Sequence, residues 1–445
     1  MTDQPNTRRM SWEEMQHLVL WVTDKLRASM ENKIKLEPSP DTLQLIHDRF
    51  TMLCQHANIN LPEKETKQLY EGVVSELVGL GPIDPFLKDD SITEVMVNDT
   101  RQVYIERDGK VIPTEARFLN DEHVHKTISK IIEPVGRTVD RKWPMVDARL
   151  PDGSRVNAII PPCAIDGPSI TIRKFSKEKL TIQDLINFGS ITEDTASFLE
   201  ACVVSRLNVV ISGGTGSGKT TLLNVLSGYI PDNERIVTIE DSAELRLNQR
   251  HVVRLEAAPA EPDGTGQVLI RDLVINALRM RPERIIVGEC RGGEALDMLQ
   301  AMNTGHDGSL TTIHANTPRD TISRLETLVL MSGMDLPLSV VRRQIVSAID
   351  LIVQQARLRD GSRKVTHITE VQGLEGETVV LQDIFTFDEQ GEDENGKVIG
   401  QLTPTGIRPK FTERLSKHGF NLLPTVFMKP GQADILGSGK GKRGR

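Results

Sequence analysis

The sequence predicts an α/β protein whose C-terminal domain has a parallel central sheet, preceded by a smaller α+β domain and an N-terminal helical module. Three observations support this prediction. Apolar residues first recur at helical spacing, short β-like runs follow, and from about residue 181 buried-type strands alternate with helices. We therefore expect a helical module at 1–70, an α+β domain at 71–175, a linker at 176–182, an α/β domain at 183–430 with a C-terminal subregion from about 341, and a flexible basic tail at 431–445.

The N-terminal module is predicted to be helical because its apolar side chains recur every three or four residues. Met15, Leu18, Val22 and Leu26 have this spacing, and 43–53 repeats it. A third helix is expected at 63–80, where a Gly-Pro pair ends it.

The next segment changes period and reads as compact α+β structure. Short β-like runs are expected at 94–97, 103–106, 110–112, 155–160 and 169–173, with a helix at 123–133. Asp108-Gly109 is a hairpin-turn signal between two of these runs. Near the C-terminus, 364–371 and 378–386 are expected to form a strand pair.

Composition excludes several classes of protein. The chain has 445 residues, a net charge of −8 and 4% aromatic residues, which disfavours a nucleic-acid-binding surface. We expect no transmembrane segment and no signal peptide, because no apolar run is long enough. The four cysteines are far apart and are expected to be reduced, mostly buried thiols of a cytosolic protein.

A glycine-rich loop carries the strongest chemical signal. A buried-type strand at 207–212 runs into GGTGSGKTT, and an apolar helix follows. This is G-x-x-x-x-G-K-[ST] in its strand–loop–helix setting, which predicts a phosphate-binding loop for ATP. Lys219 would reach the β- and γ-phosphates, and the Thr220 hydroxyl would reach Mg²⁺. The predicted nucleotide-binding residues are Gly213, Gly214, Thr215, Gly216, Ser217, Gly218, Lys219, Thr220 and Thr221.

Acidic residues follow two further predicted strands. Strand 235–239 ends at Glu240, and strand 284–288 ends at Glu289. Because the carboxyl ends of parallel strands meet at one edge of a sheet, both carboxylates should converge on the triphosphate. We favour Glu240 as the group that orients the attacking water and Glu289 as the metal-side group, but the reverse assignment stays open.

A fourth predicted strand, 309–313, ends at His314. A polar residue at the end of a central strand beside the nucleotide strand can sense the γ-phosphate. His314 could do so by a hydrogen bond to phosphate or to a catalytic carboxylate, although a lone histidine is more often structural.

These blocks in their order resemble the secretion ATPases of type II and type IV machineries. GGTGSGKTT, TIEDSAEL, RMRPERIIVGECRGGEA and TGHDGSLTTIHAN are similar to the Walker A, Asp, Walker B and His boxes of that superfamily. The Gly-Glu ending of the Walker B strand is itself a feature of the family. Upstream stretches resemble the N-terminal domain of the CpaF/TadA-type branch, the motor of tight-adherence (Flp) pili.

The resemblance implies a RecA-like ATPase domain behind a PAS-like N-domain. It implies a cytoplasmic homohexamer, peripherally associated with the inner membrane, that hydrolyses ATP at subunit interfaces and drives a membrane platform. Arginines of the N-domain would reach the phosphates, here Arg149, Arg155 and Arg173, and His306 would join His314 near them. The zinc site of some family members is not expected, because the required cysteine cluster is missing from the sequence.

Other functions remain possible from the sequence. A nucleic-acid motor or a conjugation-type secretion ATPase is the main alternative to a pilus motor, and the P-loop permits it. A nucleotide-binding regulator without turnover is a third, which Glu240 and Glu289 argue against.

Overall fold

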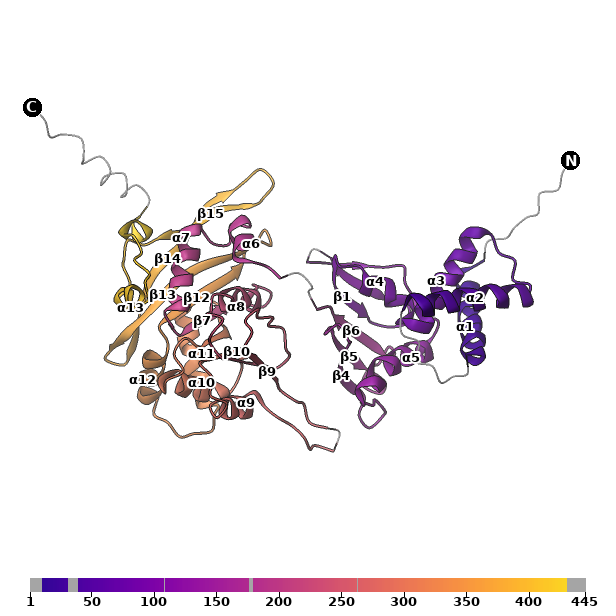
Figure 1. Cartoon of the computed structure of the whole chain (residues 1–445), viewed down its shortest axis with the longest axis horizontal. Coiled ribbons are helices and arrows are strands. Elements are labelled where there is room, and N and C mark those ends of the chain that lie inside the picture. The colour runs from indigo at the N-terminus through magenta and orange to yellow at the C-terminus, as the bar shows by residue number, and fades with distance from the viewer. Residues whose placement is uncertain (1–9, 31–38, 108, 176–178, 262, 430–445) are drawn as a thin grey trace, which may run out of the picture. The chain divides into compact units, whose positions relative to one another are not determined.

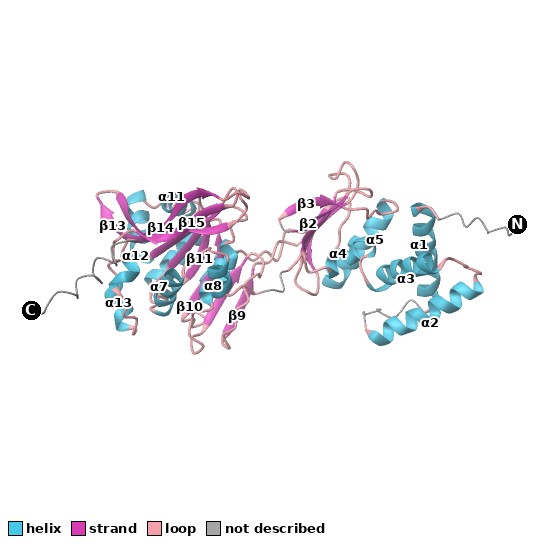
Figure 2. Cartoon of the chain, turned by 90° about the horizontal axis from the view of Figure 1, so that it is seen from above, coloured by secondary structure: helices cyan, strands magenta, loops and turns pink. Residues whose placement is uncertain are grey.

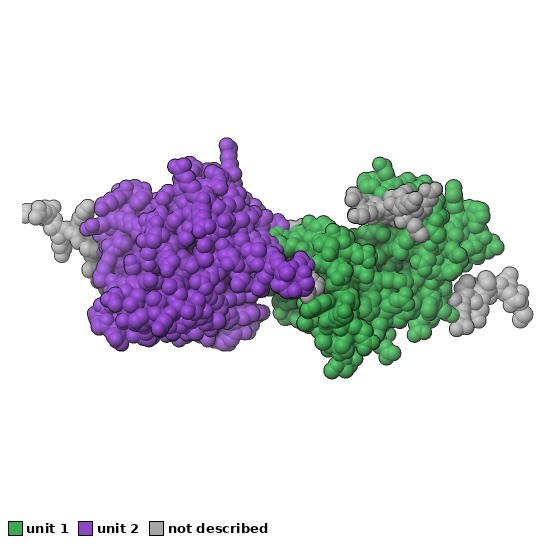
Figure 3. Space-filling view, turned by 90° about the horizontal axis from the view of Figure 1, so that it is seen from below, with its two compact units in different colours: residues 1–178 green, residues 179–445 purple. Residues whose placement is uncertain are grey.

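The computed structural model describes residues 10–30, 39–107, 109–175, 179–261 and 263–429. The chain divides into two compact units, residues 1–178 and 179–445 (Figure 3). Helices flank the strands in each of them (Figure 2). Among the described residues, no helix has the length and apolar character needed to cross a bilayer.

Three helices begin the first unit: α1 (Trp12–Ser29), α2 (Pro40–His56) and α3 (Glu63–Val78). Ser11 and Glu14 form a capping box that starts α1. The apolar faces of the helices share a core around Val22, Ile46 and Leu69, which are fully buried. The predicted helices are thus present, and the boundary expected at residue 70 falls inside α3.

An antiparallel six-stranded sheet makes up the rest of the first unit, in the order β3-β2-β1-β6-β5-β4. Its core is shared with α5 (Asp121–Ile132). The strands are β1 (Ile92–Val97), β2 (Val103–Arg107), β3 (Lys110–Pro113), β4 (Met145–Arg149), β5 (Arg155–Ile159) and β6 (Ser169–Arg173), and a short helix, α4 (Asp84–Lys88), precedes them. Strand β4 was not predicted, and the PAS-like character of this region stays a prediction.

A buried polar cluster joins the helices of this unit to its sheet region. Glu76 of α3 lies 2.8 Å from His123 Nε2 on α5, and its backbone carbonyl accepts a 2.7 Å bond from Lys130 Nζ. Burial by itself would raise the pKa of Glu76, but His123 and Lys130 hold that pKa below its ordinary value. The helical module and the α+β region therefore share a charged interior.

The second unit is built on one mixed sheet, in the order β15-β14-β13-β12-β7-β11-β10-β8-β9 (Figure 1). The six strands from β12 to β9 are parallel, and β13 to β15 extend the sheet in antiparallel fashion. The strands are β7 (Val209–Gly213), β8 (Ile236–Glu240), β9 (Val252–Glu256), β10 (Arg284–Cys290), β11 (Leu310–His314), β12 (Leu351–Arg357), β13 (Arg363–Glu375), β14 (Thr378–Glu392) and β15 (Val398–Pro404).

Helices cover both faces of this sheet. Alternate residues of β7 point to opposite faces: Val209 and Ile211 join one apolar core and Val210 the other. The first core contains α6 (Ile182–Asn187), α7 (Glu193–Val204), α8 (Lys219–Ser227) and α13 (Thr412–Lys417); the second contains α9 (Ile270–Ala277), α10 (Glu294–Asn303), α11 (Pro318–Leu330) and α12 (Leu338–Ala348). A doubly covered, largely parallel sheet confirms the predicted α/β class.

The C-terminal subregion differs from the expectation in one respect. Its predicted strand pair is present as β13 and β14. The unpredicted β12 pairs directly with β7, however, and so makes this subregion part of the same sheet. The cysteines differ too, since Cys202 and Cys290 are buried but Cys163 is exposed.

Candidate nucleotide site

The glycine-rich loop leaves the carboxyl end of β7, in the centre of the sheet. Gly216 and Gly218 have φ values of +70° and +94°, which favour glycine at both positions. At Gly213 a Cβ atom would lie 2.3 Å from the backbone oxygen of Gln355 on β12, so no larger residue fits. The loop therefore has the tight curvature that a phosphate-binding loop needs.

Helix α8 begins at Lys219, directly after the loop, so the first backbone N–H groups of the helix face the loop. Lys219 Nζ donates to the carbonyl oxygen of Gly214 at 3.1 Å, and Ser217 Oγ to the same oxygen at 2.9 Å. Burial lowers the pKa of Lys219, the Glu289 carboxylate opposes that shift, and Arg291 adds to it. Lys219, Glu289 and Arg291 thus interact electrostatically at one place.

Glu289 lies near the end of β10 and forms an ion pair. Its Oε2 accepts bonds from Arg291 Nε at 2.8 Å and Nη2 at 2.7 Å, and Arg291 Nη1 lies 3.5 Å from Asp241. The Glu289 side chain is 25% exposed, so water reaches it. Arg291 was not singled out from the sequence, although it stands two residues after Glu289.

Glu240 ends β8 and is almost completely buried. Its Oε2 accepts backbone bonds from Glu244 at 2.7 Å and Leu245 at 2.9 Å, while Oε1 has no partner among the described residues. Burial raises the pKa of Glu240, and the two backbone bonds oppose the rise. One carboxylate oxygen therefore holds the following loop, and the other is left for a further partner. Gly288, before Glu289, leaves room for the Glu240 side chain.

His314 ends β11 and pairs in register with Gly213, so it lies beside the start of the phosphate loop and is exposed. Asn316, two residues later, is also close: its Oδ1 would be 3.8 Å from a Cβ on Gly214. The structure thus brings His314 to the predicted edge and adds Asn316, a residue not predicted from the sequence to belong to the site.

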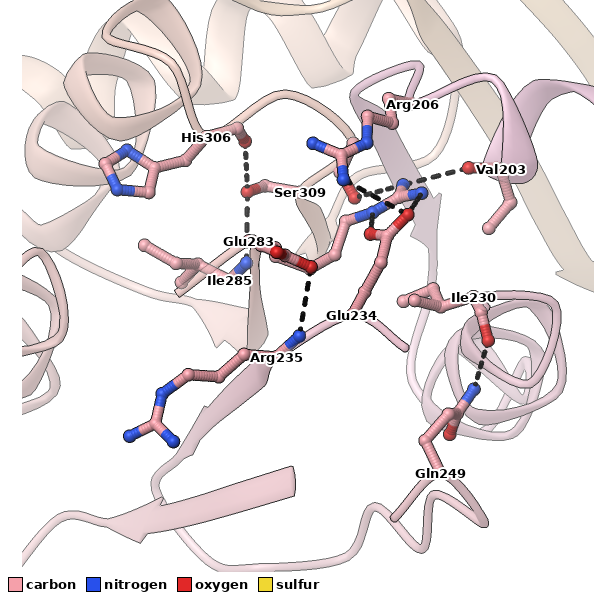
Figure 4. A network of polar contacts seen from close by, with 12 residues as sticks. Val203, Arg206, Ile230, Glu234, Arg235, Gln249, Glu283, Ile285, His306 and Ser309 are labelled. Carbon is pink, nitrogen blue, oxygen red and sulfur yellow. Dashed lines mark hydrogen bonds and ion pairs between the residues drawn. The ribbon is translucent and has the colours of Figure 1, made fainter. Parts of the chain in front are cut away.

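His306 lies elsewhere. It precedes the amino end of β11, and Ser309 Oγ donates to its carbonyl oxygen at 2.8 Å (Figure 4). Because β7 and β11 are parallel, this end of β11 is opposite to the phosphate loop. The expectation that His306 joins the phosphates is wrong, because the strand between the two histidines separates them by its whole length.

Figure 4 shows that the edge around His306 carries a structural ion-pair network. Arg284 is fully buried, pairs with Glu234, and donates to the carbonyl oxygens of Val203 at 2.8 Å and Gly308 at 3.1 Å. Arg206 Nη2 adds a second cation 3.3 Å from Glu234. This network ties together the amino-terminal edge of the sheet.

The three arginines predicted to reach the phosphates lie in the first unit as cross-strand neighbours. Arg149 of β4 pairs in register with Arg155 of β5, which pairs with Arg173 of β6. Arg173 Nε is 3.6 Å from Glu94 Oε1, and its side chain is 64% exposed. The sheet therefore gathers the three arginines into one row, which their order in the sequence did not reveal.

Comparisons with known proteins found similar proteins over much of this chain. The family model described as "Type II/IV secretion system protein" matches residues 76–390. A putative conjugal transfer protein of Mycobacterium tuberculosis is 35% identical over 308 residues, which cover 68% of this chain and 87% of that protein. The type IV secretion system protein VirB11 of Bartonella quintana is 35% identical, covering 67% and 93% of the two chains.

Two solved structures are also similar. The VirB11 ATPase of the Brucella suis type IV secretion system, in complex with sulphate, is 32% identical with a TM-score of 0.37, covering 65% of this chain and 92% of that one. The pilus retraction motor PilT with bound ADP is 19% identical with a TM-score of 0.47, covering 74% and 83%. The family match spans most of the chain and includes the phosphate loop, both acidic strand ends and His314, so the chain belongs to the type II/IV secretion system protein family.

Proposed function

We propose that this chain is an ATPase that powers a type IV secretion machine of the conjugation type. The observation that carries the proposal is the convergence of the phosphate loop, Glu240, Glu289 and His314 on the carboxyl-terminal edge of one parallel sheet. Ligands of open α/β sheets bind at that edge. Carboxylate side chains beside a phosphate-binding loop favour hydrolysis of the nucleotide over nucleotide binding alone.

The residues present fit ATP and Mg²⁺. Gly216 and Gly218 have the positive φ values that suit a phosphate-binding loop, and Gly213 packs against the backbone of β12. Lys219 offers a positive charge to the phosphates. Thr220, in the first turn of α8, would hold Mg²⁺ with Glu289. When bound, the ion would neutralise charge on the β- and γ-phosphates.

Two carboxylates are available to orient the attacking water, and their environments differ. Glu289 is partly exposed and ion-paired with Arg291, so it has to exchange that partner before it can act. Glu240 has one oxygen without a described partner, and burial raises its pKa, as suits a general base. We therefore keep Glu240 as the water-orienting group and Glu289 as the metal-side group.

The choice of machine rests on relatives rather than on geometry. The relatives named above are a putative conjugal transfer protein and VirB11, each about one third identical to this chain. We therefore place conjugation-type secretion before the tight-adherence pilus motor that the upstream motifs resemble. In either machine the chain would act as a cytoplasmic homohexamer beneath an inner-membrane platform.

Glutamine variants test the hydrolytic assignment. Glu240→Gln and Glu289→Gln should each lower kcat by about two to four powers of ten while ADP binding stays near wild type. Full turnover in Glu240→Gln would give the base role to Glu289. Full turnover in both variants would contradict the assignment of this edge as a catalytic site.

A second experiment separates the candidate machines. The gene for this chain is deleted in its native host, and DNA transfer and the number of surface pili are then measured in the same cells. Loss of transfer supports the conjugation-type proposal, whereas loss of pili alone overturns it in favour of the pilus motor. ATP turnover with and without DNA shows whether the chain itself acts on nucleic acid.

The arginine row offers a mechanism between subunits. A neighbouring arginine in other P-loop enzymes contributes about three to five powers of ten to kcat. We propose that the row Arg149–Arg155–Arg173 supplies this charge to a phosphate loop of the ring. Arg173→Ala and Lys219→Ala subunits should each be inactive alone, and mixed rings should recover turnover. No recovery in mixed rings of confirmed composition would contradict action between subunits.

A further inference from the structure

Two arginines lie beside the phosphate loop on the side of β12, opposite to the acids. Arg357 ends β12, Arg363 begins β13, and the two are in-register partners across these antiparallel strands. Strand β12 pairs with β7 so that Gln355 is opposite Gly213. Glu289, by contrast, belongs to β10, which is reached through β11 on the other side of β7.

Both arginines approach the glycines of the loop. Arg363 Nε donates to the carbonyl oxygen of Gly216 at 3.0 Å. A Cβ atom built on Gly216 would lie 3.8 Å from Arg357 Nη1, and one on Gly218 would lie 3.2 Å from Arg363 Cδ. Both side chains are exposed, so their guanidinium groups are accessible to a ligand of the loop.

The arginine pair places two like charges opposite each other on neighbouring strands. Like charges directly opposite each other on neighbouring strands are destabilising. No ion pair is present for Arg357 or Arg363 within the described ranges. Asp360, in the turn between them, accepts from Ser362 and from the backbone N–H of Val398. These bonds lower the pKa of Asp360 to about 2 and occupy both of its oxygens.

A third arginine of the same turn shows the contrast. Arg359 is paired with Glu389 at 2.7 Å and also with Glu392, both on β14. The turn thus contains one arginine with two acidic partners and two arginines that face the phosphate loop. An anionic ligand in the loop would supply the missing negative charge.

We propose that Arg357 and Arg363 are substrate-binding residues that contact the nucleotide's phosphate chain from the β12 side. This inference rests on the proposed function, because it takes the loop ligand to be a nucleoside di- or triphosphate. The γ-phosphate is expected toward Glu289 and His314, so the arginines serve the phosphates nearer the ribose. They stabilise bound ATP and the transition state alike, and therefore act on binding rather than on the chemical step.

The test measures ADP affinity and steady-state ATP kinetics in Arg357→Ala, Arg363→Ala, the double variant and the control Arg359→Ala. Each single variant should weaken ADP binding about fivefold, and the double variant about twentyfold, as expected for exposed charge-assisted contacts. KM for ATP should rise by similar factors while kcat stays within about twofold. Arg359→Ala, whose partners lie on β14, should bind ADP like wild type.

One further variant, Arg363→Gln, separates nucleotide binding from support of the loop. Arg363→Gln keeps a donor for the Gly216 carbonyl without the charge, and it should lose ADP affinity nearly as far as Arg363→Ala. Wild-type affinity in Arg363→Gln would overturn the proposal, since Arg363 would then only brace the loop. A drop in kcat at unchanged KM would overturn it as well.

Lys219→Ala distinguishes this proposal from the proposed function. If Lys219→Ala loses ADP binding while the arginine double variant keeps it, the arginine proposal fails and the nucleotide site stands. If Lys219→Ala binds ADP like wild type, the proposed function itself fails. Thermal unfolding of every variant confirms that the chain is folded before affinities are compared.

Discussion

Replacing Gly213 by alanine tests the packing beneath the phosphate loop. The added Cβ would lie 2.3 Å from the Gln355 carbonyl oxygen and 2.6 Å from Ser217 Oγ, where ordinary contacts begin at 3.4 Å. Strand β12 would have to move about 1 Å away from β7 or the loop would have to open, because the nearest atom belongs to the backbone. Both strands are buried in the centre of the sheet, so neither can move without disturbing the core.

The expected cost is about 2–3 kcal/mol, typical of overpacking in a well-packed interior. For a unit of this size that corresponds to a fall in Tm of about 4–6 °C. Gly214→Ala is the matched control, because its Cβ would have only Asn316 Oδ1 nearby, at 3.8 Å. Thermal unfolding followed by circular dichroism measures both. Equal Tm values for the two alanine variants would refute the argument that β12 holds Gly213 in place.

Further predictions concern buried charges. Because burial raises the folded-state pKa of Glu240, the folded chain binds more protons than the unfolded chain between pH 4.5 and that raised pKa. The contribution of Glu240 to stability should therefore fall as pH rises through this interval, and Glu240→Gln should gain Tm relative to wild type over the same interval. A constant difference in Tm would contradict this. Arg284→Met leaves the buried Glu234 carboxylate without its main partner and should cost about 3–5 kcal/mol, measured by urea unfolding at pH 7. Adding Glu234→Gln should restore part of that loss, and no restoration would argue against the ion pair as the cause.

The phosphate loop could be predicted from the sequence because the residues that identify it are consecutive. A buried strand, GGTGSGKTT and an apolar helix follow one another directly, and β7 and α8 are found at those positions. The acids were predictable for a similar reason, since Glu240 and Glu289 each lie at the end of a strongly apolar run. Their different partners, namely two backbone N–H groups for Glu240 and Arg291 for Glu289, depend on side-chain placement that the pattern does not encode.

The features of the site that were not predicted depend on the pairing of strands that are far apart in the sequence. Strand β12 brings Arg357 beside a loop about 140 positions earlier in the chain, and its short apolar run LIV gave little signal of a central strand. The row formed by Arg149, Arg155 and Arg173 likewise depends on the register of three strands. His306 was misplaced because its role was inferred from the family resemblance alone. The predicted strand at 309–313 already places His306 before the amino end of that strand, away from the phosphate loop.

The most direct test of the central claim is the steady-state rate of ATP hydrolysis by the purified full chain and by Lys219→Ala, with Mg²⁺ present. Lys219 begins α8 and carries the charge of the loop. The account predicts measurable turnover by wild type and turnover below a tenth of that rate in Lys219→Ala, with the fold of the variant intact. Wild-type turnover in a folded Lys219→Ala variant would contradict the assignment of this loop as the site of ATP hydrolysis.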